Sequence, residues 1–345
     1  MRVLAAMSGG VDSSVAAALL VEEGHDVVGV TLRLWENTGD SGCCSVAEID
    51  DARSVATALG IDHLVWTFVD DFDAQVVAPY VAAHAQGLTP NPCIECNRHL
   101  KFGRLLRRAV TLGFDAVATG HHARTVTDVD GRHRLLRGAD AAKDQSYVLY
   151  VLGQDELARC RFPVGSMTKA DVRAKAAALG LATADKPDSQ DVCFVTTSGG
   201  RHALLGSRIP LHPGRVLDRA GAEVGRVDAV ELVTVGQRRG LGGGGGTRRY
   251  ALDVDPATST VVVGDAADLL AAEVSLDRLC WVHGPVAGPV EAQTSAHGTP
   301  VDAEYADGVV RFAEPRPRVA PGQSVVLYRG DEVLGGGVAL RAGPR

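Results

Sequence analysis

A short loop near the N-terminus has residue types suited to binding a phosphate group. Residues 8–14 read Ser-Gly-Gly-Val-Asp-Ser-Ser, between an apolar run and a helical pattern. Adjacent glycines let the backbone approach an anion closely, and a helix N-terminus supplies amide groups and a positive dipole. Ser13 and Ser14 offer hydroxyl donors, and Asp12 is a candidate helix cap or Mg²⁺ ligand. Because the sequence has no Gly-Lys-Ser/Thr, this loop is not of the type that cradles β- and γ-phosphates.

Three cysteines form a second group of chemically active residues. Cys93 and Cys96 stand three positions apart, and Cys193 lies about a hundred residues later in Asp-Ser-Gln-Asp-Val-Cys-Phe. We expect a basic helix to begin at Asn97, because a thiol beside a helix N-terminus and arginines has a depressed pKa and becomes a good nucleophile. Three chemistries are compatible with these residues: a zinc site, which lacks a fourth ligand, an iron–sulfur cluster on all three thiols, or a redox pair that carries a persulfide.

Composition narrows the class of protein. The chain has 345 residues, with 35 basic and 42 acidic side chains and a net charge of −7, which argues mildly against non-specific nucleic-acid binding. Its length predicts two or three domains at roughly 150 residues each. We expect no membrane span and no signal peptide, because the apolar runs are too short, and therefore a cytoplasmic location. Seven cysteines, an odd number at low density, argue against a disulfide framework.

The pattern along the chain changes near residue 200. Before it, apolar runs predict strands at 3–6, 27–32, 63–68 and 116–119, and helical patterns predict helices at 12–23, 44–59, 72–85, 97–112 and 169–179. This alternation predicts a parallel sheet covered on both faces. After it, glycine and proline become frequent, and Val-rich runs at 259–264, 308–312 and 324–327 predict antiparallel sheets or a small barrel.

These patterns divide the chain into three domains. We expect an α/β fold with an N-terminal parallel-sheet, Rossmann-like domain at 1–200. A small central β-rich domain at 201–265 and a C-terminal antiparallel β-barrel-like domain at 266–345 follow. The five-glycine run at 242–246 is either a flexible loop or a functional one.

The loop at 8–14 resembles the pyrophosphate-binding loop of the N-type ATP pyrophosphatases. That superfamily cleaves ATP between its α- and β-phosphates and adenylates a carbonyl-type oxygen. The resemblance implies that ATP, with Mg²⁺, is bound by Ala6, Met7, Ser8, Gly9, Gly10, Val11, Asp12 and Ser13, with Leu32 at the adenine. It also implies a nucleotide contact at Gly120, which follows the fourth predicted strand.

Six motifs in order extend the resemblance to almost the whole chain. After the loop come Thr-Pro-Asn-Pro-x-x-x-Cys-Asn, Ala-Thr-Gly-His, Lys-Asp-Gln-Ser-Tyr, Asp-Ser-Gln-x-x-Cys-Phe and Gly-Gln-Arg-Arg-Gly-Leu-Gly. Together they are similar to those of the bacterial tRNA-specific 2-thiouridylases. That family converts C2=O of wobble uridine 34 into C2=S in tRNAs for Lys, Glu and Gln, releasing AMP and pyrophosphate. The resemblance implies tRNA and a sulfur donor, a cysteine desulfurase or a sulfur-carrier protein, as partners.

The resemblance assigns roles residue by residue. It implies Cys96 as the nucleophile and Cys193 as the persulfide carrier, and the two can close a disulfide. It implies contacts to the target base or tRNA for Asn91, Pro92, Cys93, His121, Lys143, Asp144 and Gln145. Many relatives have Asp where this chain has Cys93, so a carboxylate base does not transfer, and a [4Fe-4S] cluster on Cys93, Cys96 and Cys193 becomes the alternative. Residues 302–305 are acidic where the family often has a basic pair, which argues against tRNA contact there.

The remaining signals are weaker. We expect Cys43 and Cys44 to be incidental neighbours, and Cys160 and Cys280 to be buried apolar fillers. Basic residues cluster in the helix after Cys96, at Arg132/Arg134/Arg137, at Arg238/Arg239 and at Arg248/Arg249, which favours contact with a phosphate backbone.

Two rival functions remain open. The first is a small-molecule synthetase with the same loop. That function would not explain the cysteines or the β-rich C-terminal part. The second is a non-enzymatic RNA-binding module. The physiological sulfur donor and the oligomeric state do not follow from the sequence.

Overall fold

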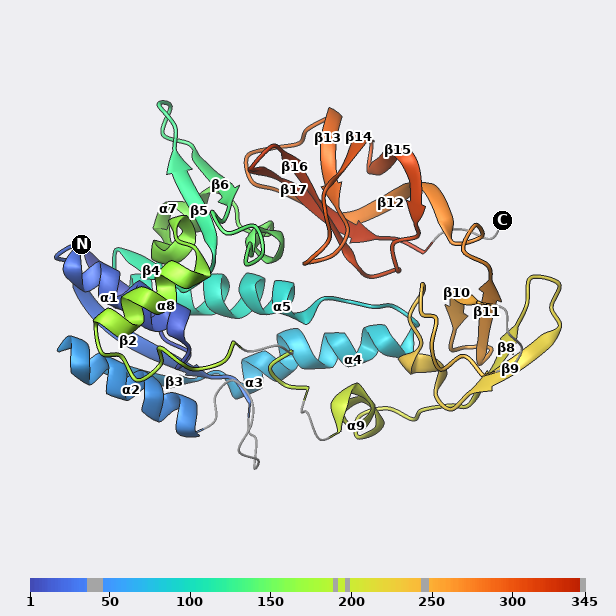
Figure 1. Cartoon of the computed structure of the whole chain (residues 1–345), viewed down its shortest axis with the longest axis horizontal. Coiled ribbons are helices and arrows are strands. Elements are labelled where there is room, and N and C mark those ends of the chain that lie inside the picture. Colours follow the sequence, from blue (N-terminus) through green and yellow to red (C-terminus); the bar gives the residue numbers. More distant parts are fainter. Residues whose placement is uncertain (36–45, 189–191, 196–198, 243–247, 342–345) are drawn as a thin grey trace.

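The computed structural model describes residues 1–35, 46–188, 192–195, 199–242 and 248–341, arranged around three sheets (Figure 1). Cys43, Cys44 and glycines 243–246 lie outside the described residues. In the described part of the chain, no helix is long and apolar enough to span a membrane.

The N-terminal sheet is parallel, as predicted. Its strands, in spatial order, are β3 (His63–Thr67), β2 (Asp26–Arg33), β1 (Arg2–Ala6), β4 (Ala116–Ala118) and β7 (Cys160–Arg161). Leu4 of the central strand β1 pairs with Val28 on one side and Val117 on the other, and its side chain is fully buried. Apolar residues on β1 and β4 contact helices on both faces of the sheet. Because neither face of these strands meets water, their sequences are continuously apolar.

Helices cover this sheet and extend from it toward the other two. They are α1 (Val11–Glu22), α2 (Val46–Leu59), α3 (Val69–Phe72), α4 (Ala78–Ala85), α5 (Pro92–Glu95), α6 (Leu106–Thr111), α7 (Gln154–Arg159), α8 (Lys169–Ala178) and α9 (Gly200–Gly206). π-Helical segments at Asp73–Val77 and Cys96–Leu105 join α3 to α4 and α5 to α6. Short 3₁₀ turns occur at Ser146–Leu149, Pro163–Ser166 and Val230–Leu232.

The helix starts predicted at 72 and 97 were wrong, since helical structure begins earlier, at Val69 and at Pro92. Helical structure begins at Pro92 instead of Asn97, because Asn91 is the N-cap, accepting from the Cys93 amide at 3.0 Å, and a proline is favourable at the first helical position. Cys93, rather than Cys96, therefore lies in the first turn. Helix α1 begins at Val11 with Gly10 as its N-cap, so Asp12 does not cap it.

The central sheet has four short strands in the order β10 (Tyr250–Asp255), β11 (Thr260–Gly264), β8 (Gly214–Leu217) and β9 (Glu223–Val227). Its valine side chains form a separate core. The sequence predicted antiparallel pairs, but β11 pairs with β8 in parallel. These two strands are separated by many residues along the chain, so local patterns did not indicate their direction.

The C-terminal part is a closed six-stranded barrel, which confirms the predicted barrel-like fold. Its strands are β12 (Leu270–Trp281), β13 (Gly288–Gln293), β14 (Val301–Ala306), β15 (Val309–Pro317), β16 (Ser324–Arg329) and β17 (Glu332–Ala339). Neighbouring strands are antiparallel, and β12 pairs with β17 to close the barrel.

A hairpin from the N-terminal part joins the barrel's sheet, a contact that the sequence did not predict. Strands β5 (Ala123–Thr127) and β6 (His133–Arg137) form the hairpin, and Leu136 pairs with Glu332 of β17 (Figure 1). Arg134 reinforces it through an ion pair with Glu332 at 2.6 Å. The barrel is therefore fixed against the α/β part at this edge.

Candidate active site

A cavity of about 470 Å³ lies at the carboxyl ends of β1, β2 and β4. Open parallel sheets bind ligands at this edge. The predicted site residues that line the cavity are Ala6, Met7, Ser8, Gly10, Val11, Asp12, Ser13, Leu32, Pro92, Cys93, Cys96, Gly120, His121, Lys143, Asp144, Gln145 and Cys193. Gly9 and Asn91 do not line it: Gly9 is part of the adjoining turn, and Asn91 caps the helix that carries two of the cysteines.

The loop at 8–14 is held in one shape by close backbone contacts. Gly9 has a φ of +73°, and a Cβ there would meet the carbonyl oxygen of Glu48, so only glycine fits. Gly120 packs against the first turn of α1, where a Cβ would lie 2.5 Å from the amide nitrogen of Ser13. These two contacts fix where the loop's amides lie relative to the cavity.

The two serine hydroxyls of the loop have different surroundings. The Ser13 hydroxyl donates to the Gly10 carbonyl at 3.0 Å and accepts from the Ser8 amide at 3.1 Å, beside the cavity. The Ser14 hydroxyl donates to the same carbonyl at 2.9 Å, and the residue is fully buried. The expectation that both hydroxyls face a ligand is therefore wrong for Ser14, because its side chain bonds back to the helix start.

Asp12 is the centre of an ionic cluster beside the loop. Both of its carboxylate oxygens accept from Lys169 Nζ at 2.7 Å, and one lies 3.2 Å from His122 Nε2. Burial by itself would raise the pKa of Asp12, but the contacts with His122 and Lys169 outweigh it, so the pKa lies below its usual value. Asp12 is therefore a carboxylate at neutral pH.

A second carboxylate, Asp188, collects three cations. Its oxygens accept from Lys143 and Lys169 at 2.8 Å and from Arg173 at 2.9 Å. Partial burial opposes ionisation, yet the hydrogen bonds from Lys143 and Lys169 lower the pKa of Asp188 to about 2. This carboxylate holds positive side chains at the cavity wall.

Sequence reasoning missed several of these residues. Lys186 lines the cavity and donates to the Gly9 carbonyl at 2.9 Å and to Asp51 at 2.7 Å. Asp188 is the first residue of the motif that contains Cys193, and Lys186 lies two residues before it, so that motif was a signal for both. Lys169 carries no comparable signal, because only the fold brings α8 to the loop, whereas His122 directly follows the Ala-Thr-Gly-His motif.

The three cysteines line the same cavity. Cys96 is only 6% exposed and belongs to an apolar core cluster, against which Cys193 packs, whereas Cys93 is exposed. Phe194, the neighbour of Cys193, is buried among aromatic rings, with centroids 5.5 Å from both Phe72 and Tyr80. This anchor explains how a cysteine about a hundred residues away in sequence reaches the cavity wall.

His121 and residues 143–145 also line the cavity. His121 is buried, and its Nδ1 lies 2.7 Å from the Thr119 hydroxyl. Burial lowers the pKa of His121 well below its usual value, and the charges of Lys101 and His122 add to this. The imidazole is therefore neutral at pH 7 and serves as a hydrogen-bonding group rather than a cation.

The barrel contributes to the site through two loops. His297, between β13 and β14, lines the cavity, and sequence reasoning missed it. Its loop is braced by Gln293, which donates to the Ser295 carbonyl at 2.9 Å and accepts from Arg137 at the same distance. Elsewhere, the Thr89 amide donates to the Pro321 carbonyl at 2.7 Å, which ties the segment before Asn91 to the barrel.

Several basic residues predicted to contact RNA have partners within the protein. Arg134 pairs with Glu332, and Arg137 pairs with Asp144 at 2.9 Å and lies over the Tyr328 ring. These two side chains connect the hairpin to the barrel, so the prediction of phosphate contact is corrected for them.

The basic helix after Cys96 is also largely engaged. Arg104 pairs with Asp71 at 2.8 Å, and Arg108 lies over the Trp66 ring. Arg98 donates to Cys280 Sγ at 3.1 Å. Cys280 is half-buried and hydrogen-bonded rather than an apolar filler, whereas the prediction of a buried thiol is confirmed for Cys160, whose pKa burial raises.

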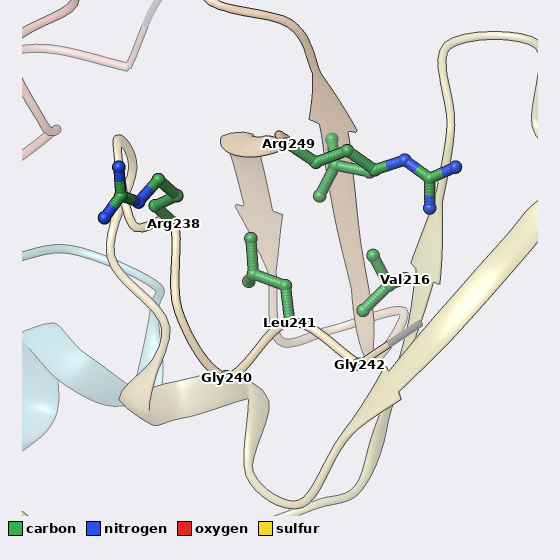
Figure 2. Close-up of a pocket in the computed structure, with 7 residues that line it drawn as sticks. Val216, Arg238, Gly240, Leu241, Gly242 and Arg249 are labelled. Carbon is green, nitrogen blue, oxygen red and sulfur yellow. The ribbon is translucent and has the colours of Figure 1, made fainter. Parts of the chain in front are cut away.

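A second pocket, of about 290 Å³, lies in the central domain between Arg238 and Arg249 (Figure 2). Gly240, Leu241 and Gly242 form part of its wall. Figure 2 shows that the two guanidinium groups point away from each other, so they do not converge on one small anion. They present positive charge on either side of the pocket.

The sheet, the cavity at its carboxyl edge and the glycine loop at the start of α1 define a nucleotide-binding α/β domain. Three family models match in turn: the tRNA methyl transferase HUP domain at residues 1–197, the tRNA methyl transferase PRC-barrel domain at 202–265, and the aminomethyltransferase beta-barrel domain at 285–339.

Relatives of known name match over nearly the full length. The tRNA-specific 2-thiouridylase MnmA of Chloroflexus aurantiacus is 48% identical, covering 99% of this chain and 98% of its own length. That of Mycobacteroides abscessus is 49% identical, covering 99% and 100%. The chain belongs to the tRNA-specific 2-thiouridylases, and it is a tRNA-uridine 2-sulfurtransferase.

Proposed function

We propose that this enzyme uses ATP to adenylate O2 of wobble uridine 34 in tRNAs for Lys, Glu and Gln, and then replaces that oxygen with sulfur from a persulfide on Cys193. The observation that carries the proposal is that one cavity is lined both by a glycine loop with cations and by the cysteines. An adenylating synthetase for a small molecule needs only the first group.

The ATP end fits a nucleotide in size and chemistry. A volume of about 470 Å³ lies in the range of small-molecule sites, and Lys169 and Lys186 supply positive charge beside the loop amides. The adenine lies against Leu32 and Gly120, and the phosphates lie on residues 8–13. Asp12 and the phosphate oxygens would hold Mg²⁺, which would supply charge neutralisation for the departing pyrophosphate.

Adenylation requires the target base to leave its stack and enter the cavity. Pro92 and Cys93 contact the base, and Asn91 positions them as the cap of their helix. Neutral His121 offers a hydrogen bond. Uridine O2 attacks the α-phosphorus, the bond from that phosphorus to the bridging oxygen breaks, and its electron pair leaves with pyrophosphate. The N3 proton passes to water. O2 is then part of an AMP leaving group.

Sulfur transfer uses two cysteines in separate roles. A cysteine desulfurase or sulfur-carrier protein places a persulfide on Cys193, and its terminal sulfur attacks C2, expelling AMP. The Cys96 thiolate then attacks Cys193 Sγ, and the breaking S–S bond leaves its electron pair on the thiouridine sulfur, while N3 regains a proton. In a second route, Cys96 first attacks Cys193 Sγ and the terminal sulfur of the persulfide leaves as hydrosulfide. The hydrosulfide then attacks C2 and expels AMP. In both routes a Cys96–Cys193 disulfide forms, and an external dithiol must reduce it.

An iron–sulfur route remains the alternative. Cys93, Cys96 and Cys193 line one cavity, but among the described residues no three Cys, His, Asp or Glu side chains are gathered to hold a metal ion. As arranged, the three thiols do not fit an iron–sulfur cluster.

Recognition of tRNA extends beyond the cavity. Lys143 and Gln145, which line the cavity, contact the RNA, and Asp144 fixes this segment by accepting from Arg137 and Ser146. Arg238 and Arg249 of the central domain contact the RNA backbone. Each of the three domains, at 1–200, 201–265 and 266–345, then contributes to one RNA-binding surface of the protein. Reduced thiols and a tRNA substrate are consistent with a cytoplasmic location.

The test follows both half-reactions with unmodified tRNA, ATP, a cysteine desulfurase and its sulfur source. Wild type should form AMP only when tRNA is present, and 2-thiouridine should appear in nuclease digests by mass spectrometry. Cys193→Ser should still form AMP but no 2-thiouridine, because serine keeps the size of the side chain and removes the sulfur. AMP formation independent of tRNA, or full thiolation by Cys193→Ser, would overturn the proposal.

A further inference from the structure

Lys169 places a cation beside the phosphate loop. Its side chain is 12% exposed and lines the cavity, with Nζ 2.7 Å from both oxygens of Asp12 and 2.8 Å from Asp188. Its backbone is fixed as well, because Thr168 caps helix α8 and the Lys169 amide donates to Asp140 at 2.9 Å. The ammonium group is therefore held at the loop without support from a ligand.

The partners of Lys169 are arranged so that it can change partners. Asp188 also pairs with Lys143 and Arg173, and Asp12 also contacts His122, so neither carboxylate loses its last partner if Lys169 moves to a new anion. A buried carboxylate left alone would be strongly unfavourable, and these second partners avoid that cost.

Lys186 differs from Lys169 in this respect. It donates to the Gly9 carbonyl and to Asp51, so its ammonium group supports the loop backbone itself. Moving it to a ligand would remove that support. Of the two cations, Lys169 is therefore the better candidate for direct contact with a phosphate group.

We propose that Lys169 is a catalytic residue that binds the β- and γ-phosphates of ATP and stabilises the leaving pyrophosphate. The inference rests on the proposed adenylation. As the bond to the α-phosphorus breaks, its electron pair adds negative charge to the pyrophosphate, and the ammonium group, which stays protonated, stabilises that charge more than the charge of bound ATP. When Lys169 turns to the phosphates, the Asp12 oxygens it occupied become available to Mg²⁺.

The experiment compares Lys169→Met with Lys175→Met in the full-length protein. Lys175 is on the same helix and pairs with Glu22 at 2.7 Å, away from the cavity, so it controls for loss of a lysine from α8. The first readout needs no turnover. It measures how well inorganic pyrophosphate and AMP each displace a fluorescent ATP analogue from the protein. We expect Lys169→Met to weaken pyrophosphate binding by about tenfold or more, the effect of one lost charge-assisted hydrogen bond, while AMP binding stays unchanged.

The second readout is tRNA-dependent AMP formation. Lys169→Met should lower kcat more than it raises KM for ATP, and Lys169→Arg should recover part of kcat because it keeps the charge. Pyrophosphate affinity and kcat equal to those of Lys175→Met would overturn the role of Lys169. Loss of AMP binding along with pyrophosphate binding would also overturn it, since that indicates a distorted site. Failure of wild type to form AMP would instead reject the proposed adenylation, and the pyrophosphate measurement would still test Lys169.

Discussion

The two ends of the cavity are built by different physical means. At the phosphate end, comprising residues 8–14 with Lys169, Lys186 and Asp188, ion pairs and hydrogen bonds fix the side chains. At the thiol end, comprising Cys93, Cys96 and Cys193, the last two pack in an apolar cluster that contains aromatic rings, whereas Cys93 is exposed. The first end carries charges already in place, and the second carries reactive atoms among packed rings.

This difference corresponds to the two half-reactions. Phosphoryl chemistry generates negative charge on oxygen, so fixed cations that need no reorganisation lower its barrier. Persulfide chemistry moves a soft, polarisable sulfur and must exclude water that would compete for the activated uridine. A single cavity with a charged end and an apolar end supports both, provided that each end can be altered without disturbing the other.

The largest expected effect is at the phosphate end. In Gly120→Ala, the new methyl group would lie 2.5 Å from the Ser13 nitrogen and 2.6 Å from the Asp12 carbonyl carbon, so the loop must shift. We expect tRNA-dependent AMP formation to fall by about a hundredfold, as for other misplacements near 1 Å. Persulfide loading of Cys193, measured by mass spectrometry with a cysteine desulfurase, should be retained. Gly284→Ala, where a Cβ meets nothing within 4 Å, is the matched control; equal rates for the two variants would contradict the geometry.

A smaller effect is expected at the thiol end from Cys93→Ser. In the persulfide route Cys93 neither carries nor releases sulfur, so thiolation should fall by about two- to tenfold with AMP formation preserved. The measurement is 2-thiouridine yield in protein purified anaerobically, alongside iron and sulfide content. Complete loss of thiolation together with bound iron would instead establish the cluster route.

A third comparison of the two ends concerns the pH dependence of folding stability rather than activity. Burial lowers the pKa of His84, which contacts the Tyr80 ring near the thiol end, to about 4, below its usual 6.5. Its stabilising contribution is therefore complete above pH 6.5 and is lost as the pH falls toward 4, by up to about 3 kcal/mol. Asp188, despite partial burial, has a pKa lowered from 3.8 to about 2 by Lys143 and Lys169, so its contribution is lost only between about pH 4 and 2.

Urea denaturation across this pH range tests both windows. His84→Gln should flatten the pH dependence of the midpoint between pH 6.5 and 4, and Asp188→Asn should flatten it below pH 4. An unchanged slope in the corresponding window of either variant would show that the group does not titrate as its surroundings indicate.

Local patterns were enough to predict much of the α/β part. The apolar runs that became β1, β2, β3 and β4 are short and bounded by turn residues, and the glycine loop follows the first of them directly. The predicted start of a helix was wrong where a capping side chain sets it, as at Asn91, whose side chain accepts from the Cys93 amide. Roles failed where a partner is distant, as for Arg134 and Arg137, whose carboxylate partners include one about 200 residues away.

The sequence by itself determined the strand–helix alternation, the glycine loop and the identity of the three cysteines, because each depends on neighbouring residues. The tertiary structure decided what meets in the cavity. Lys169 pairs with Asp12 157 residues earlier, and His297 reaches the same space from the barrel. Such contacts depend on how helices pack on the sheet and how the barrel docks against it. No local propensity encodes them, since they are set by the total of long-range packing and ion pairing.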